Sequence, residues 1–379
     1  MYSYQKTNRY FAQAADDIKD IAEEEILSLG GTDIRQTYRG LYFTASRKTL
    51  YSINYHARLL NRVLAPLVSF NCHDDRYLYR QASQIQWEDF LSVSNTFAVF
   101  ATVSNSRIRH SRFAALRLKD AVADHFRSRS GKRPSIDTKR PDIWFNLHIE
   151  NDKATISLDT SGGSLHRRGY RRESTEAPMI ETLAAAIIRY SGWRGESFLY
   201  DPFCGSGTFL CEAFMYASNT PSAVLRNEFG LERLPDFDSP LWKKTVLEGK
   251  QKIRPVLRGT IAGSDISPDA VQTARRNCST IDRGNNIRVE HQDVFDIESL
   301  RDKTIICNPP YGIRSGRASQ MPDFYARFGD FLKRRCRGST AFIYFGEPEF
   351  IKKIGLKPSW KKELSNGGLK GRLVRYELY

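Results

Sequence analysis

The spacing of apolar and polar residues divides the chain into two stretches with different rhythms. Up to about residue 160, short alternating runs and amphipathic helices follow one another in a mixed α+β order. From residue 174 onward, short apolar runs alternate regularly with helical patterns. These runs are predicted strands over 198–201, 260–265, 287–290, 304–307 and 341–345. Such alternation predicts an α/β domain with a doubly wound, mostly parallel sheet.

The first fifty residues predict a strand, a helix and two further strands. Apolar residues recur at near-helical spacing from Ile18 to Leu29, and the pair Gly30-Gly31 predicts the end of this helix. Residues 32–46 then read as two extended runs joined at Arg39-Gly40. This order is typical of a small ferredoxin-like α+β domain, which we expect over residues 1–50.

A second α+β domain is predicted over residues 51–160. Residues 50–64 and 112–126 have helical patterns, and 96–103 reads as a strand. The domain closes with a predicted hairpin, because residues 143–150 alternate, Asn151-Asp152 can turn the chain, and the alternation resumes at Ile156 and Leu158. A basic linker over 161–178 then leads to the α/β domain, expected over 179–379.

Charge suggests a kind of partner for this organisation. The 379 residues include 58 Lys and Arg against 43 Asp and Glu, a net charge of +15, which favours nucleic acid first and an acidic membrane surface second. Residues 105–140 hold eleven basic residues against three acids, a density suited to a phosphate backbone, although any one of them can be an ordinary solvated charge. The candidate nucleic-acid contacts are Arg107, Arg109, Arg112, Arg167, Arg168, Arg171 and Arg172.

Two classes of protein are disfavoured by composition. The chain has no run of about eighteen apolar residues and its N-terminus lacks the apolar core of a secretory signal, so we expect a cytoplasmic protein without a membrane-spanning helix. Its six cysteines form no C-x-x-C pair, so we expect buried reduced thiols and no metal site.

Three loops that follow predicted strands carry candidate cofactor contacts. In Asp201–Thr208, glycines allow a ligand to approach the backbone at the carboxyl end of the sheet; the loop has neither the lysine of a Walker A sequence nor a full GxGxxG, and a plain tight turn explains it equally well. Asp265 follows the next strand and can accept both hydroxyls of a ribose, and Asp293 can accept an adenine amine. Each acid, taken alone, is more simply a helix cap or a solvated charge.

The motif Asn308-Pro309-Pro310-Tyr311-Gly312 is far more specific. It follows the apolar run 304–307, and its two prolines stiffen a backbone that cannot donate hydrogen bonds. The Asn308 side chain and the Pro309 carbonyl can both accept from one NH2 group, while Tyr311 offers a ring for stacking on a base. An exocyclic amine held in this way presents its lone pair to an electrophile. Asn308, Pro309 and Tyr311 are therefore the candidate catalytic residues, and a merely rigid loop is the alternative.

Together these motifs resemble those of the class I S-adenosylmethionine-dependent amino-methyltransferases, over about residues 165–379. The resemblance implies a Rossmann-like domain, S-adenosylmethionine as the cofactor, and a target amine held at the Asn-Pro-Pro-Tyr motif. A stretch containing Glu176-Ala177-Pro178 resembles the helix that closes the family's cofactor site. The implied cofactor contacts are Asp201, Pro202, Cys204, Gly205, Gly207, Thr208, Asp265, Ile266, Asp293, Val294 and Pro178. One departure is that 57 residues separate Gly207 from Asp265, so 218–257 is expected to be an insertion with some helix.

The N-terminal half resembles a ferredoxin-like domain followed by a THUMP domain, and 165–171 resembles the basic linker of RNA guanine-N2 methyltransferases. The overall likeness is to the guanine-N2 half of the bacterial 23S rRNA large-subunit methyltransferases. It implies methylation of guanine N2 in structured RNA, with rRNA ahead of tRNA. Adenine-N6 methylation of DNA or RNA, a non-catalytic RNA-binding or ribosome-assembly protein, and a nucleophile at Cys307 remain alternatives.

Overall fold

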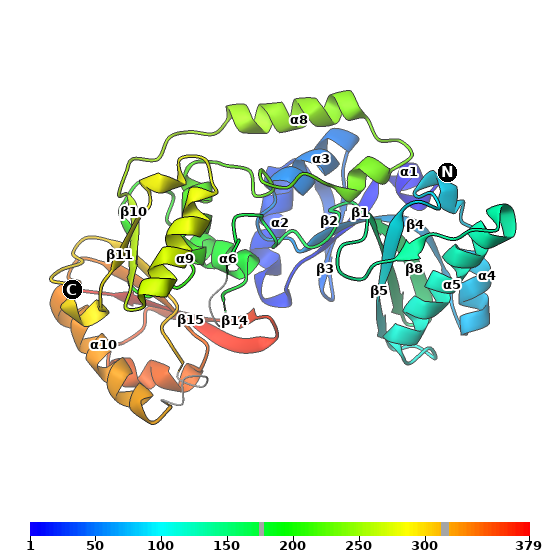
Figure 1. Cartoon of the computed structure of the whole chain (residues 1–379). Coiled ribbons are helices and arrows are strands. Elements are labelled where there is room, and N and C mark those ends of the chain that lie inside the picture. The colour runs from blue at the N-terminus through cyan, green and yellow to red at the C-terminus, as the bar shows by residue number, and fades with distance from the viewer. Residues whose placement is uncertain (174–177, 312–317) are drawn as a thin grey trace. The chain divides into compact units, whose positions relative to one another are not determined.

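The computed structural model describes residues 1–173, 178–311 and 318–379, and it forms two compact units (Figure 1). The first consists of Met1–Leu165 together with Arg226–Leu247, and the second of His166–Leu225 together with Glu248–Tyr379. Each unit is built on its own sheet. In the part of the chain that is described, no helix is long and apolar enough to cross a membrane.

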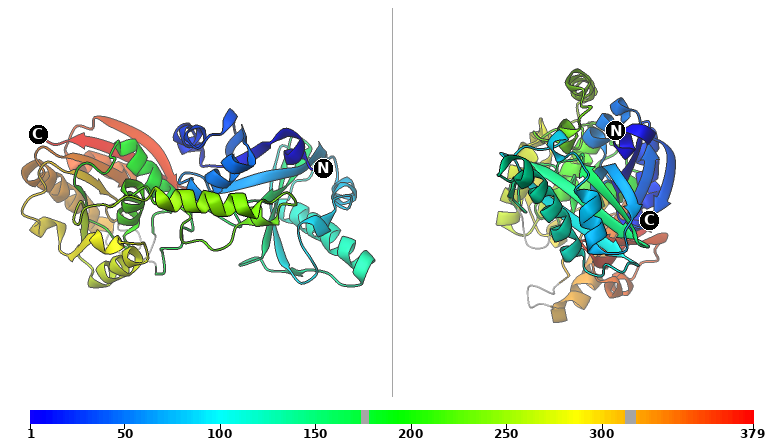
Figure 2. Two further views of the ribbon diagram at one scale, coloured as in Figure 1. Left: turned by 90° about the horizontal axis from the view of Figure 1, so that it is seen from above. Right: turned by 90° about the vertical axis from the view of Figure 1, so that its right-hand side faces the viewer.

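The first unit contains one eight-stranded sheet in the order β2-β3-β1-β4-β8-β7-β5-β6. Its strands are β1 (Arg9–Gln13), β2 (Thr32–Thr37), β3 (Gly40–Thr44), β4 (Arg62–Asn71), β5 (Thr96–Ser104), β6 (Ser135–Ile136), β7 (Ile143–Glu150) and β8 (Lys153–Asp159). Its helices are α1 (Ser3–Thr7), α2 (Lys19–Ser28), α3 (Arg47–His56), α4 (Asp75–Ala82) and α5 (Ser111–Ser130), with 3-10 turns at Asp16–Ile18, Trp87–Asp89 and Gly230–Arg233. Helices α4 and α5 lie side by side (Figures 1 and 2).

The predicted strand-helix-strand-strand order is present as β1, α2, β2 and β3. Helix α2 ends where expected, and Gly30 directly after it has a φ of +95°, which a residue with a side chain rarely adopts. Tyr10 and Phe43 are buried, whereas their neighbours Phe11 and Tyr42 point to the opposite face and remain partly exposed. Alternation along each strand therefore separates a helix-facing core from a second, more open face.

The predicted helix over 50–64 is wrong in its second half. Helix α3 ends at His56, and Arg62 begins the long strand β4. β4 pairs with β1 on one side and with β8 on the other, so it joins the two halves of the unit into one sheet. Val63, Leu64 and Ala65 are all buried. A continuous apolar run of this kind is compatible both with a strand that is buried on both faces and with a helix. The hydrophobic pattern alone therefore could not show that the helix ends before residue 62.

The predicted hairpin is confirmed as β7 and β8, paired antiparallel. Asn151 and Asp152 make the turn with φ values of +50° and +55°, a left-handed pair that Asn and Asp tolerate. The predicted helix over 112–126 is also present, within the longer α5.

The segment Arg226–Leu247 falls within the insertion noted between Gly207 and Asp265, yet it packs in the first unit. Trp242, 9% exposed, lies on α8 (Ser239–Gln251), and its ring contacts Tyr51 at 5.7 Å, Tyr55 at 5.8 Å and Phe229 at 4.8 Å. The backbone N–H of Leu231 donates to Thr160 at 2.7 Å. Gly230 lies so close to the Asp159 carbonyl that a Cβ would overlap it. Two N-terminal elements, α3 and β8, are thus completed by a late piece of the chain.

The second unit holds a seven-stranded sheet in the order β11-β10-β9-β12-β13-β15-β14. Its strands are β9 (Leu199–Asp201), β10 (Ile261–Asp265), β11 (Arg288–His291), β12 (Thr304–Cys307), β13 (Thr340–Phe345), β14 (Trp360–Asn366) and β15 (Leu369–Glu377). Its helices are α6 (Glu181–Ser191), α7 (Thr208–Ala217), α9 (Pro268–Ser279) and α10 (Met321–Arg335), with 3-10 turns at Gly284–Asn286, Val294–Asp296, Ala318–Gln320 and Pro348–Ile354. Strands β9 to β13 are parallel, and β14 and β15 form an antiparallel hairpin at one edge. The five predicted strands are all present, with ends within one residue of those expected.

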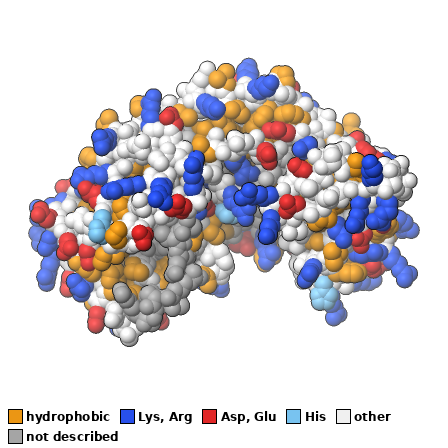
Figure 3. Space-filling model, in the orientation of Figure 1, with side chains coloured by type: hydrophobic (Ala, Val, Ile, Leu, Met, Phe, Trp, Pro, Cys, Tyr) orange, Lys and Arg blue, Asp and Glu red, His pale blue; other side chains and the backbone are white. Residues whose placement is uncertain are grey.

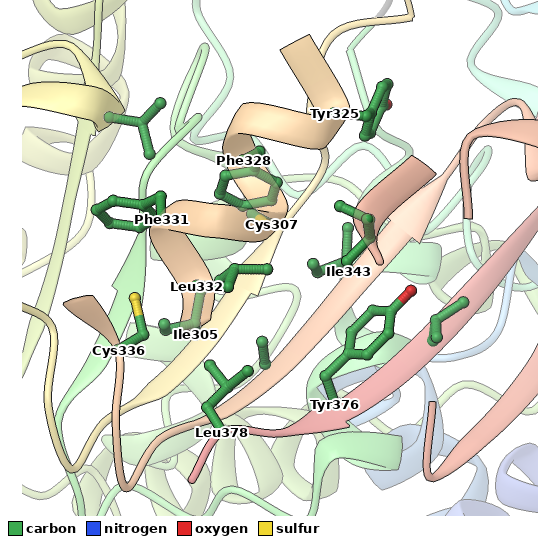
Figure 4. Close-up of a cluster of buried hydrophobic side chains, with 14 of the residues drawn as sticks. Ile305, Cys307, Tyr325, Phe328, Phe331, Leu332, Cys336, Ile343, Tyr376 and Leu378 are labelled. Atoms are coloured by element: carbon green, nitrogen blue, oxygen red, sulfur yellow. The ribbon is translucent and has the colours of Figure 1, made fainter. Parts of the chain in front are cut away.

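Strand order reverses beside β9, since β10 lies on one side and β12 on the other. The loops after these three strands consequently meet at one edge of the sheet, where ligands bind in doubly wound folds. Below that edge, α10 packs on β12, β13 and β15 through a buried apolar cluster (Figure 4). Tyr325 and Phe328 of α10, Cys307 of β12 and Ile343 of β13 belong to it. The loops at the carboxyl ends of these strands are therefore supported by a close-packed core.

We predict that Trp242→Ala destabilises the first unit. Loss of a buried tryptophan costs about 3–5 kcal/mol. Because the two units need not unfold together, the measurement is hydrogen exchange of the amides in α3 and β8 rather than a single melting curve. The matched control is Leu247→Ala on the same helix, whose side chain is 56% exposed and should change stability by less than ~0.5 kcal/mol. Unchanged protection in the Trp242 variant would contradict the packing described.

Candidate active site

The loop after β9 is shaped by one buried acid and two glycines. Asp201 is buried at the strand end, and its Oδ1 accepts from the backbone N–H of Phe203 at 3.0 Å. Burial raises the pKa of Asp201 well above its usual range, and the nearby Asp265 carboxylate adds to the rise. Gly205 and Gly207 have φ values of +51° and +82°. A Cβ on Gly207 would also lie 3.2 Å from the Cβ of Ala274, so this turn needs glycine for both backbone and space.

Asp265, at the end of β10, connects two of the loops. Its Oδ2 accepts from the N–H of Gly205 at 2.9 Å, and its Oδ1 accepts from the N–H of Ser267 at 2.9 Å. The helix cap of α9 is Ser267, whose side chain accepts from Ala270, so the reading of Asp265 as the cap is not needed. A carboxylate has about four acceptor positions. Two therefore remain at Asp265 for the paired hydroxyls of a ribose.

The residues next to Asp265 suit a flat apolar ring. Ile266 is 65% exposed, which is unusual for isoleucine beside a strand end. Asp293 follows β11, the strand paired with β10, and its Oδ1 accepts from Phe295 as the cap of a short 3-10 helix. The interpretation of Asp293 as a helix cap is thus confirmed. Only Oδ1 of its carboxylate takes part in the hydrogen bond to Phe295. Asp265 thus offers acceptors for ribose hydroxyls and Ile266 offers an apolar surface for a base, and their contact with the cofactor stays a prediction.

Asn308 and Tyr311 lie together directly after β12. The Tyr311 hydroxyl donates to Asn308 Oδ1, while the Tyr325 hydroxyl donates to the Pro310 carbonyl at 3.1 Å. Tyr325 stacks on Phe350 at 4.7 Å, so the Pro-Pro turn is fixed to the buried cluster below it. An amide oxygen carries two lone pairs. Asn308 can accept from Tyr311 and from a second donor.

Gly346 is a residue that the sequence reasoning missed. It follows β13, the strand paired with β12, and a Cβ there would overlap the ring of Tyr311. The sequence did contain a signal for Gly346: it directly follows the apolar run 341–345, a predicted strand whose carboxyl end lies at the same edge of the sheet as the other loops. Only a residue without a side chain leaves Tyr311 this position.

Two of the arginines predicted to contact RNA make hydrogen bonds within the second unit. Arg168 is 1% exposed, and its Nε donates to Glu212 Oε1 at 3.2 Å, which also accepts from the Tyr170 hydroxyl at 3.0 Å. Arg171 donates to Glu181 at 2.8 Å, to the Ser206 hydroxyl at 3.1 Å and to the Thr208 hydroxyl at 2.9 Å. We therefore withdraw Arg168 as an RNA contact, since its guanidinium is buried. Arg171 holds the 201–208 loop in place.

The other predicted contacts are distributed as follows. Arg107, Arg109 and Arg112 are exposed around the start of α5, in a region where Lys and Arg side chains gather (Figure 3). Arg167 and Arg172 are exposed in the second unit. Pro202, Cys204, Thr208 and Val294 are buried at the ends of β9 and β11, and Pro178 is half-buried. Glu176, Ala177 and Gly312 lie outside the described residues.

All six cysteines are free and buried, as expected. Burial raises the pKa of Cys307 well above its usual range, and the neighbouring Asp201 contributes. Over residues 1–173, 178–311 and 318–379, no group of three His, Cys, Asp or Glu side chains is placed to hold a metal ion.

Comparison with known families identifies each of these parts. The profile of an RMKL-like methyltransferase domain matches residues 168–375. The chain belongs to this family. A THUMP domain matches 72–159 and an RlmL ferredoxin-like domain matches 9–64, so the expected domain types and fold class are confirmed.

Individual relatives agree with the family. A Synechocystis sp. protein named "Putative RNA methyltransferase slr0064" is 39% identical over 374 residues, covering 98% of this chain and 97% of its own. The protein named "Ribosomal RNA large subunit methyltransferase K/L" is 37% identical in Syntrophotalea carbinolica and 34% in Methylococcus capsulatus. The chain spans about half of these K/L proteins, 53% and 51% respectively, while they match 98% of it.

Solved structures share the whole fold. "SMU.472, a putative methyltransferase complexed with SAH" has a TM-score of 0.85 and 26% identity over 98% of both chains. A "possible methylase" from Clostridium difficile 630 has a TM-score of 0.84 at 24% identity, which shows the fold alone. The prediction that the chain is an S-adenosylmethionine-dependent methyltransferase is therefore confirmed at the level of the family.

We predict that Gly346→Ala displaces the Tyr311 ring while cofactor binding persists. The added methyl group would overlap the ring, whereas Asp201 is held by the N–H of Phe203 and Asp265 by the N–H of Gly205. A misplacement of about 1 Å can cost on the order of a hundredfold in rate. The measurement pairs a methyl-transfer rate with calorimetric binding of S-adenosylhomocysteine. Equal loss of both, or loss of neither, would refute this role for Gly346.

We also predict that Arg168→Met reduces stability rather than RNA affinity. The change strands the Glu212 carboxylate in the interior, at a cost of about 3–5 kcal/mol. Arg167→Met is the matched control, because Arg167 is exposed one residue earlier. Hydrogen exchange of the amides in α7, the helix that carries Glu212, gives the stability, and filter binding gives the RNA affinity. A folded Arg168 variant with selectively weak RNA binding would restore the original assignment.

Proposed function

We propose that this chain transfers a methyl group from S-adenosylmethionine to the exocyclic N2 amine of a guanine in structured RNA, with 23S rRNA as the substrate. The observation that carries the proposal is the pair of acceptors after β12, Asn308 Oδ1 and the Pro309 carbonyl, beside the Tyr311 ring. The named K/L relatives act on large-subunit ribosomal RNA. The chain spans only about half of those proteins, so ribosomal RNA is a proposed substrate for this chain.

The side chains would act mainly by holding and orienting. Asp265 holds the ribose hydroxyls, and the glycine loop after β9 lets the backbone come close to the cofactor. S-adenosylmethionine, when bound, supplies an electrophilic methyl group. The Asn308 side-chain oxygen and the Pro309 carbonyl would accept hydrogen bonds from the two N–H groups of the amine. This orients the lone pair of the amine toward that methyl group. The amine becomes acidic once it carries the methyl group and a positive charge, so no strong base is required.

A guanine that is stacked in RNA must leave its stack to place its amine between Asn308 and the Pro309 carbonyl. Flipping a base costs a few kcal/mol, and stacking on Tyr311 offsets part of that cost. The exposed arginines around α5 suit the phosphates of the surrounding RNA, which would position the substrate without reading its sequence. This assignment also implies work in the cytoplasm, where ribosomal RNA is available.

Three alternatives are separable by their chemistry. Adenine N6 would use the same acceptors, and a Listeria monocytogenes structure described as a "predicted N6-adenine-specific DNA methylase" shares the fold at 24% identity. A covalent mechanism through Cys307 is disfavoured, because its thiol is buried and its raised pKa keeps it protonated. A non-catalytic RNA-binding protein would have no need for the intact pair of acceptors at Asn308.

The decisive measurement supplies labelled S-adenosylmethionine with rRNA, tRNA and DNA in separate reactions, followed by digestion to nucleosides. We expect label in N2-methylguanosine from 23S rRNA. Label in N6-methyladenosine would select the adenine alternative, label from tRNA alone would change the substrate, and stoichiometric RNA binding without label would indicate a non-catalytic role.

We predict that Asn308→Ala lowers the transfer rate by about 10²–10³ while cofactor binding stays nearly unchanged. The change removes a side-chain acceptor for the amine, and single acceptors or donors of this kind are typically worth about 10²–10³ in rate. Calorimetry with S-adenosylhomocysteine serves as the control. Loss of cofactor binding in the variant would show that Asn308 supports the cofactor and would contradict its assignment to the target amine.

A further inference from the structure

The face of the first unit's sheet opposite the core carries two separate pairs of aromatic rings. Phe11 of β1 and Tyr42 of β3 are direct partners in the sheet, so both side chains lie on one face, and their rings are 4.9 Å apart. Tyr10 and Phe43, their neighbours in sequence, are buried in the core on the opposite face. Phe11 and Tyr42 themselves are only partly buried. Two rings therefore stand next to each other on the more open face of a ferredoxin-like sheet.

The open part of this face is interrupted at β4 and β8. Phe11 lies opposite Leu64 of β4, and Leu64 lies opposite Asp159 of β8, but both of these side chains are buried. Trp144 of β7 and Phe100 of β5 form a second pair of partly buried rings, with centroids 6.1 Å apart.

Cations are placed directly on these rings. The Arg9 guanidinium lies 5.1 Å from the centre of the Tyr42 ring, and the Arg62 guanidinium lies 4.3 Å from Phe100 and 4.9 Å from Trp144. Arg35 is the sheet partner of Tyr42 and is exposed. Two acids also belong to this face: Glu150 lies 3.6 Å from His148, and Asp159 pairs with Arg62.

Gly40 makes room for this arrangement. It is the first residue of β3, and a Cβ there would overlap the Ala12 carbonyl oxygen and would lie 2.5 Å from Cζ of the Phe11 ring. The lack of a side chain thus allows Phe11 to extend over the neighbouring strand. Two neighbouring, partly exposed rings flanked by arginines form a surface on which a planar base can stack.

We propose that this face, centred on Phe11, Tyr42 and Arg9, binds unpaired nucleotides of the RNA substrate by stacking. Bases stack on aromatic rings whatever their sequence, and arginines beside the rings pair with the phosphates. Aromatic residues on the central strands of a four-stranded α+β sheet are a known way to bind single-stranded RNA. A duplex keeps its bases stacked inside and would not use these rings.

This proposal rests on RNA being the substrate, and it adds a second, chemically different contact to the arginines around α5. Those arginines suit phosphates in any helix, whereas the rings select strand segments whose bases are free. The two surfaces together would favour RNA that has a helix and an unpaired stretch side by side, as ribosomal RNA folds do.

The test uses the full chain with Phe11→Leu and Tyr42→Leu combined. Leucine keeps the apolar packing but offers no ring for stacking. With a fluorescein-labelled single-stranded RNA oligonucleotide we expect affinity to fall about tenfold or more, since stacking on an aromatic side chain contributes on the order of 1–3 kcal/mol per base. With duplex RNA of the same length we expect no change, and the salt dependence should also stay the same because no cation is removed.

Two controls guard against a general defect. Tyr38→Leu removes a ring from a similar pair, in which Arg39 lies 5.0 Å from the ring centre, but Tyr38 is on the turn between β2 and β3 and should not alter affinity. The exchange Phe11→Tyr with Tyr42→Phe keeps both rings and should bind like the wild type. Unchanged single-strand affinity in the double leucine variant, or equal loss on duplex RNA, would overturn the proposal.

Methylation assays separate this proposal from the assignment of the enzyme. If the wild type methylates 23S rRNA and the leucine variant does so with a raised KM and the same kcat, both stand. If the wild type methylates rRNA but the variant binds single strands normally, only the sheet-face proposal fails. If the wild type methylates no RNA, the proposed function itself fails, whatever the oligonucleotide affinity.

Discussion

The Asp265 carboxylate accepts hydrogen bonds from two backbone N–H groups that belong to different strand-to-helix connections. Gly205 lies after β9 and Ser267 lies after β10, so one side chain fixes the spacing of both loops. Bonds of this charge-assisted kind are worth about 1.5–3 kcal/mol each. The geometry of the glycine loop, the support given to it by Arg171 and the free acceptor positions at Asp265 all follow from this link.

The support beneath the target site follows a different principle. There the backbone carries Pro309 and Pro310 and cannot donate hydrogen bonds, so the turn is secured from outside by Tyr325 and by the close fit of Tyr311 against Gly346. A polar link positions the cofactor side, and dense apolar packing positions the target side. The two halves of the site can therefore be perturbed separately by mutation.

Much of the second unit could be predicted from sequence, because short strands and helices in regular alternation leave few alternatives. The loops after β9, β10 and β12 were found for the same reason, since function concentrates where these strands end. Other features depended on contacts distant in sequence. Charge could not reveal that Arg168 meets a buried Glu212, and local pattern could not divide 50–64 between α3 and β4, because the run is apolar throughout. Spacing showed that an insertion follows Gly207, but only packing showed that Arg226–Leu247 completes the first unit.

That late completion has a consequence for how the protein is made. The first unit receives its final piece, with Trp242, only after the chain has already built the glycine loop and α7 of the second unit. Synthesis proceeds from the N-terminus. Tyr51 and Tyr55 of α3 therefore lack their contact with Trp242 until residues 226–247 have left the ribosome. No single cut in the chain can release either unit intact. The order of translation thus ties the maturation of the first unit to the production of part of the second.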